Sequence, residues 1–196
     1  MPADERREAL VLATLPLLRV HGRAVSTRQI AEAAGVAEGT IFRVFDSKDE
    51  LIEEALVKAF QPETFIDQAE GLDPTAPFRE RMVALVTLLQ KRFTDTFVLM
   101  RAVGMVGPPR HRLERGEEMD DWREQITKRM VEFVGDGADE LRISASELVH
   151  VLRLLTFSAS HPEIADGRTL TPEQIVGIVL DGVLLKDIPA KKKGAR

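Results

Sequence analysis

The sequence predicts an all-α protein, with a small helical N-terminal domain followed by a larger helical domain. Apolar residues recur at helical spacing along most of the 196-residue chain. Ser and Thr in capping positions, together with Gly and Pro between the apolar runs, divide the chain into about nine helices. No segment shows a convincing strand pattern. With 44% hydrophobic and 30% charged residues, the composition is that of an ordinary globular protein.

We place a helix-turn-helix domain at residues 1–50, a second helical domain at 51–190 and a basic disordered tail at 191–196. The first helix carries Pro16, which we expect to kink it. Pro62 is expected to close the fourth helix, and a loop follows it. The expected helices are 4–21, 26–34, 37–44, 47–60, about 15 residues around 82–93, then 95–106, 117–134, 144–160 and 171–186.

Residues 26–51 carry the most specific pattern. Ser26 and Gln29 form a capping box for a short amphipathic helix, and Gly35 supplies the left-handed conformation that ends it. The next helix buries Ile41 and Phe45, and Ser47 with Glu50 opens a third helix through a second capping box. Two short helices around a glycine turn are typical of a motif that places a helix in DNA.

Three segments of this region closely resemble the DNA-binding region of the TetR family of bacterial transcriptional regulators. They read T-R-Q-I-A-E-A-A-G-V, G-T-I-F-R-V-F and S-K-D-E-L, and all but the last of their residues lie in the predicted domain at 1–50, which is about a quarter of the chain. The resemblance implies a one-component regulator, by default a repressor, whose homodimer binds a palindromic double-stranded operator and is released by a small-molecule effector.

The resemblance also implies roles for individual residues. Thr27, Arg28 and Lys48 would face phosphates, whereas Thr40 and Arg43 would lie on the reading face, with Arg43 the best candidate for guanine. Phe42 departs from the family, which often has tyrosine there, and Ala37 stands where a capping serine or threonine is common. The whole candidate DNA-binding set is Thr27, Arg28, Glu38, Gly39, Thr40, Phe42, Arg43 and Lys48.

Charge argues against bulk attraction to nucleic acid. The chain has a net charge of −5, and residues 1–60 contain eight Lys or Arg against ten Asp or Glu. DNA binding must therefore come from the local placement of a few cations, and we expect it to be sensitive to salt. The basic tail would contribute weak phosphate contacts at most.

The helices expected at 144–160 and 171–186 are apolar around more than half of their girth, which requires burial on two sides. A two-fold interface that pairs both helices with their copies in a four-helix bundle satisfies this need, and the resemblance implies the same. The alternative is a buried central helix in a monomer.

Large, polarisable side chains of Phe, Met and Trp are concentrated in the middle of the chain. Most would be core, but such residues also suit adaptable apolar or amphipathic ligands, and the resemblance implies an effector pocket in this region. Arg101, His150 and Arg153 would meet a polar ligand group or form salt bridges. The candidate pocket set is Phe93, Phe97, Met100, Arg101, Met119, Trp122, Met130, His150 and Arg153.

Other functional classes find little support in the sequence. The four histidines are scattered without metal-ligand spacing, and there is no glycine-rich phosphate loop or nucleophile elbow, so we predict neither an enzyme nor a metal site or cofactor. The chain has no cysteine and no apolar run of membrane-spanning length, and we expect a cytoplasmic protein. The alternative function is a helical protein-interaction dimer that does not bind DNA.

Overall fold

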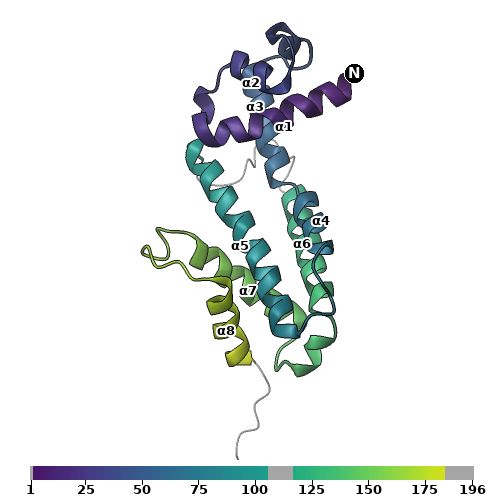
Figure 1. The fold of residues 1–196 in the computed structure, drawn as a ribbon, viewed down its shortest axis with the longest axis vertical. Helices are drawn as coiled ribbons and strands as arrows, with labels where there is room; N and C mark the ends of the chain where they lie inside the picture. Colours follow the sequence, from purple (N-terminus) through teal and green to yellow (C-terminus); the bar gives the residue numbers. More distant parts are fainter. Residues whose placement is uncertain (1, 106–116, 184–196) are drawn as a thin grey trace, which may run out of the picture.

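The computed structural model describes residues 2–105 and 117–183, which form an all-α fold with a small N-terminal domain at one end of an elongated helical body (Figure 1). The predicted fold class is therefore confirmed. Within these residues no helix is both long enough and apolar enough to cross a membrane.

The N-terminal domain is built around the long helix α1, which packs against α2 and α3. Its shared core is fully buried and includes Leu10, Leu18, Ile30, Ile41 and Leu51. The elements are α1 (Ala3–His21), the 3-10 helix η1 (Gly22–Ala24), α2 (Thr27–Ala34), the 3-10 helix η2 (Glu38–Arg43) and α3 (Lys48–Phe60). Helix α1 continues through Pro16.

Helix α5 is the spine of the second domain. It packs against α4, α6, α7 and α8, and its C-terminal end reaches α1 and η1 of the N-terminal domain (Figure 1). The elements are α4 (Glu63–Glu70), α5 (Phe78–Ala102), α6 (Glu117–Val134), the 3-10 helix η3 (Gly135–Glu140), α7 (Ala145–Ser160) and α8 (Pro172–Val183). Ser144 forms a capping box with Glu147 at the start of α7, and Pro172 is the first residue of α8.

Two of the expected helix boundaries are wrong. Pro62 does end α3, but it also lies at the N-cap of α4, in a segment predicted to be a loop. The break predicted before Asp95 does not exist, because α5 is continuous to Ala102. Instead of capping a new helix, Asp95 pairs with Lys91 one turn earlier, at 2.8 Å, and so stabilises the continuous helix.

The second element of the helix-turn-helix also differs from its prediction. Residues 38–43 form a 3-10 helix rather than an α-helix, and the Ala37 side chain makes no capping hydrogen bond. The segment is short, it lacks the capping side chain, and it contains Gly39 and the β-branched Thr40 and Ile41, all of which weaken an α-helix. The predicted tail at 191–196 lies outside the described residues.

Candidate nucleic-acid interface

Helix α2 is fixed at both ends by its own sequence. The predicted capping box is present, since Gln29 N donates to Ser26 Oγ at 3.2 Å and Ser26 N donates to Gln29 Oε1 at 2.8 Å. At the other end Gly35 adopts a left-handed conformation with φ 67°, and Val36 N donates to the carbonyl of Ala31 at 3.0 Å. The turn between α2 and η2 is thereby set by local hydrogen bonds.

The element η2 has a buried side and an exposed side. Ile41 and Phe45 are in the core of the N-terminal domain, and Phe45 N donates to the carbonyl of Ile41 at 2.9 Å. On the opposite side Phe42 is 56% exposed, Arg43 is exposed and Thr40 is half-buried. A large aromatic ring left in solvent beside an arginine makes this the surface on which a ligand is expected.

Arg7 holds the end of η2 in place, a role that the sequence analysis missed. Its Nη1 donates to the carbonyl of Val44 at 2.8 Å, its Nε donates to both carboxylate oxygens of Glu54 at 2.9 Å, and its guanidinium lies 4.2 Å from the Phe45 ring centroid. Hydrogen bonding to Glu54 raises the pKa of Arg7 further above its already high value. Arg7 thus ties α1, η2 and α3 together.

Lys48 connects α3 to the segment that precedes α2. Its Nζ donates to the carbonyls of Arg23 and Val25, at 3.2 and 3.1 Å. A lysine ammonium has three donors, so one remains for another acceptor. The predicted phosphate contact of Lys48 remains a prediction, and the structure adds a role in positioning the turn.

The other predicted DNA-binding residues lie on the same exposed side of the domain. The Thr27 hydroxyl donates to the Glu38 carboxylate, which joins the starts of α2 and η2. Arg28 pairs with Glu32 at 2.9 Å, but both side chains are so exposed that the pair contributes little and can exchange for a phosphate. Gly39 has open space around it. The hydrogen bond between Thr27 and Glu38 thus brings the predicted residues of α2 and η2 close to each other.

Comparison with known proteins agrees with this geometry. Residues 10–55, which span the packed core of α1, α2, η2 and the start of α3, match the sequence model for bacterial regulatory proteins of the tetR family. The N-terminal domain is therefore of the tetR-family type.

A transcriptional repressor is similar to part of this chain. The HTH-type transcriptional repressor KstR of Rhodococcus jostii is 45% identical over 58 residues, which make up 29% of this chain and 27% of the repressor. The match therefore spans about a quarter of the length of that relative and does not relate the whole proteins.

Solved structures of TetR regulators share the whole fold. One from Haloarcula marismortui has a TM-score of 0.63 at 19% identity, over 93% of this chain and 100% of the other. One from Streptomyces coelicolor has a TM-score of 0.55 at 23% identity, over 91% and 98%. The resemblance beyond the N-terminal domain is thus one of fold.

The predicted effector-pocket residues do not all lie together in this TetR-family fold. Phe97, Met100 and Arg101 line a cavity of about 430 Å³ between the C-terminal part of α5 and residues 160–163. Phe93 packs edge-on against Phe157 at a centroid distance of 5.3 Å, beside the cavity. Met105, which is not in the candidate set, also lines the cavity.

The remaining pocket candidates are dispersed. Met130 is fully buried in the core, His150 is exposed on α7 and Trp122 is half-buried on α6. Arg153 donates to Thr127 Oγ1 at 2.6 Å, and burial, together with nearby Arg123, lowers its pKa. The side chain of Met119 lies outside the described residues.

Phe42→Tyr is expected to tighten DNA binding. The exposed ring can carry a hydroxyl at its edge without disturbing the core, and one added hydrogen bond to a phosphate is worth about 1 kcal/mol, or roughly fivefold in affinity. Titration of fluorescent duplex DNA with both proteins measures the change. An unchanged or weaker affinity would show that the ring edge does not face the DNA backbone.

Proposed function

We propose that this protein is a TetR-family transcriptional repressor that binds a palindromic operator as a homodimer and leaves it when a small molecule binds. The observation that carries this proposal is the two-sided construction of η2. Ile41 and Phe45 fix it to the core, while Phe42 and Arg43 face outward beside the start of α2. This arrangement fits a recognition element lying in the major groove, with α2 crossing the DNA backbone.

The repressor KstR, which is 45% identical to this chain over 58 residues, supports repression as the direction of regulation. Because the chain has an acidic balance, binding depends on a few locally placed cations, so we expect operator binding to be sensitive to salt and non-specific binding to be weak. Because a regulator must reach the genome, we expect the protein in the cytoplasm.

A dimer is supported by the apolar side chains that α7 and α8 leave uncovered. Exposed apolar side chains recur at helical spacing on α7, at Val151, Leu154 and Phe157. Leu154 on α7 and Ile178 on α8 are each 58% exposed. By contrast, Val179 is only 4% exposed and belongs to the core of its own protomer. A substitution that tests the interface must therefore be made at Ile178 rather than at Val179.

Effector release is supported by the cavity at the C-terminal end of α5. Its volume of about 430 Å³ is within the range of small-molecule sites, and Phe97, Met100 and Met105 give it an adaptable apolar wall. Because the same end of α5 contacts α1 and η1, a ligand that moves it would also move the DNA-binding domain. By linkage, an effector that weakens operator binding must itself be weakened by operator DNA.

Electrophoretic mobility shift with the DNA upstream of the protein's own gene, in competition with random-sequence DNA, tests the proposal. We expect a discrete complex that survives the competitor and contains two protomers. If the upstream fragment is bound no better than random DNA, and selection from a random library enriches no sequence, then the protein is a helical interaction dimer rather than an operator-binding repressor.

Arg43→Ala is expected to relax base preference at one symmetry-related position in each half-site. A bidentate arginine–guanine contact discriminates by about 1–3 kcal/mol, which corresponds to roughly 5- to 150-fold. Arg28→Ala is the matched control, because loss of a phosphate contact should weaken all sites alike and reduce the salt slope by about one. Binding-site selection with each variant separates the two effects. If Arg43→Ala lowers the affinity for all sites equally, then Arg43 does not distinguish between bases.

A further inference from the structure

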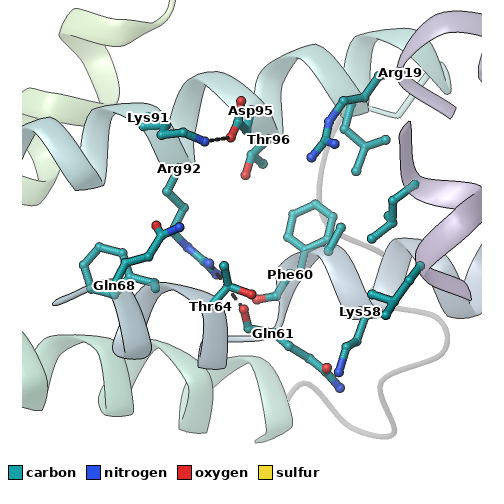
Figure 2. A pocket seen from close by; sticks show the side chains of 15 residues that line it. Arg19, Lys58, Phe60, Gln61, Thr64, Gln68, Lys91, Arg92, Asp95 and Thr96 are labelled. Carbon is teal, nitrogen blue, oxygen red and sulfur yellow. Dashed lines mark hydrogen bonds and ion pairs between the residues drawn. The ribbon is translucent and has the colours of Figure 1, made fainter. Parts of the chain in front are cut away.

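A second cavity lies at the junction of the two domains, where α1 and α3 of the N-terminal domain meet α4 and α5 (Figure 2). Its volume is about 180 Å³. No residue of the candidate effector-pocket set lines this cavity. The cavity and the one at the C-terminal end of α5 lie along neighbouring turns of the same helix. Its apolar wall is formed mainly by Leu12, Leu15, Phe60 and Leu99.

The charges on this wall are unusual for an acidic protein. Arg19, Lys58, Lys91 and Arg92 line the cavity with a single acid, Asp95, which is paired with Lys91 at 2.8 Å. Lys58 lies 3.6 Å from Glu8 outside the cavity. The wall thus carries a surplus of positive charge, although the whole chain has a net charge of −5.

Two hydrogen-bond donors face the cavity without a protein acceptor. Figure 2 shows the Arg19 guanidinium and the Thr96 hydroxyl on the same side of the space beside the Phe60 ring. In the part of the chain that the structure describes, neither side chain forms a hydrogen bond or an ion pair. Donors left open beside an apolar wall are the usual means by which a pocket orients a polar ligand group.

Arg92 adds a cation that is largely shielded from water. Its Nη2 and Nη1 donate to the carbonyls of Phe60 and Gln61, at 2.8 and 3.3 Å, and so cap the C-terminal end of α3. Burial lowers the pKa of Arg92, while the charge of Glu63 opposes this effect. No carboxylate among the described residues is hydrogen-bonded to it, so an anion in the cavity would stabilise its charged form.

We propose that the junction cavity binds a small amphipathic anion, a carboxylate whose charged group is held by Arg19, Thr96 and Arg92 and whose hydrocarbon part lies on Leu12, Leu15, Phe60 and Leu99. The small volume limits the enclosed part to a short chain or a single ring. A neutral amphipath of the same shape would leave the cations uncompensated, and a purely inorganic anion would leave the apolar wall exposed to water.

Occupation of the site would act on the DNA-binding domain, a consequence that rests on the proposed function. Arg92 holds the last carbonyls of α3, and α3 carries at its other end the residues next to η2. An anion competes for the same guanidinium donors, which loosens the end of α3 and the contact between the domains. The anion is therefore expected to weaken operator binding.

Isothermal titration of the full chain, without DNA, with octanoate, octanamide and inorganic phosphate tests the proposal. We expect one octanoate per protomer, roughly tenfold weaker binding of octanamide and no comparable binding of phosphate. Arg19→Gln and Thr96→Val, both changes of accessible side chains, should each weaken octanoate binding by roughly three- to tenfold or more. Arg142→Gln, an exposed change at the opposite end of the second domain, should leave it unchanged.

Octanoate binding that is absent, that ignores Arg19→Gln, or that is matched by octanamide would overturn the proposal. Phosphate binding as tight as octanoate, with the same dependence on Arg19, would also overturn it and would identify an inorganic-anion site. These outcomes do not depend on DNA binding. If octanoate binds as expected while operator affinity stays the same, only the coupling to the proposed function fails.

Discussion

Ile178→Glu is expected to convert the dimer to a monomer and to abolish operator binding at the same time. Ile178 is exposed in the protomer, so the fold should tolerate the change, whereas a carboxylate buried without a partner in a dimer interface costs several kcal/mol. About 3 kcal/mol corresponds to a dissociation constant raised by more than 100-fold. Sedimentation and mobility shift on the same preparations measure both effects.

Val20→Glu provides the control, because Val20 is an exposed apolar residue on α1, away from α7 and α8. It should leave the dimer intact. The far-ultraviolet circular dichroism of both variants should match that of the parent. An Ile178→Glu protein that remains dimeric would place the interface on another surface, and a monomer with undiminished operator affinity would contradict the two-half-site account.

Gly22→Ala is expected to be the most destabilising single methyl addition in the N-terminal domain. Gly22 ends α1 with φ 56° and ψ −146°, a conformation that is nearly restricted to glycine. A Cβ there would lie 2.2 Å from the carbonyl oxygen of Ala102, so the end of α5 would have to move. We expect a loss of about 3 kcal/mol or more and a melting temperature lower by roughly 6–12 °C.

Gly35→Ala is the matched control for this prediction. Gly35 also has a positive φ, 67°, but a Cβ there meets no atom within 4 Å, so only the backbone penalty of about 1–2 kcal/mol applies. Calorimetry of both variants measures the difference. In the Gly22→Ala variant, the two domains should also unfold in separate calorimetric transitions. Equal destabilisation by the two substitutions would mean that the contact between Gly22 and Ala102 does not hold the domains together.

The features that the sequence predicted well are those determined over a few residues. The capping box of Ser26 with Gln29, the left-handed Gly35 and the inward Ile41 and Phe45 all follow from local backbone rules, and all are present. Phe42 stands out because an aromatic residue on the polar side of an amphipathic segment has no place in the core. The sequence therefore predicted the local geometry of α2 and the turn after it, whereas the DNA contacts assigned to this surface remain predictions.

The errors have physical causes that short patterns do not contain. A helix start at Asp95 is wrong because Asp95 pairs with Lys91 within one continuous helix, and a loop after Pro62 is wrong because Pro62 also lies at the N-cap of α4. Arg7 has no local pattern that reveals its role, because its partners Val44 and Glu54 are brought to it by the fold.

The junction cavity had no local signal at all. Arg19, Phe60 and Thr96 come from three helices, and each alone has the pattern of an ordinary surface or core residue. Their shared wall follows from the way in which α5 crosses the end of α1, a long-range contact that periodicity does not encode. For the same reason, only Phe97, Met100 and Arg101 of the candidate pocket set line a common cavity.

Dimethyl sulfate protection of the bound operator tests the central claim most directly, because this reagent methylates guanine N7, which lies in the major groove. The account predicts protection of a guanine in each of two half-sites related by two-fold symmetry, with centres separated by about one helical turn or a multiple of it. Arg43→Ala should remove that protection at protein concentrations that still saturate the DNA. Saturated DNA with every guanine N7 fully reactive would contradict the placement of η2 in the major groove.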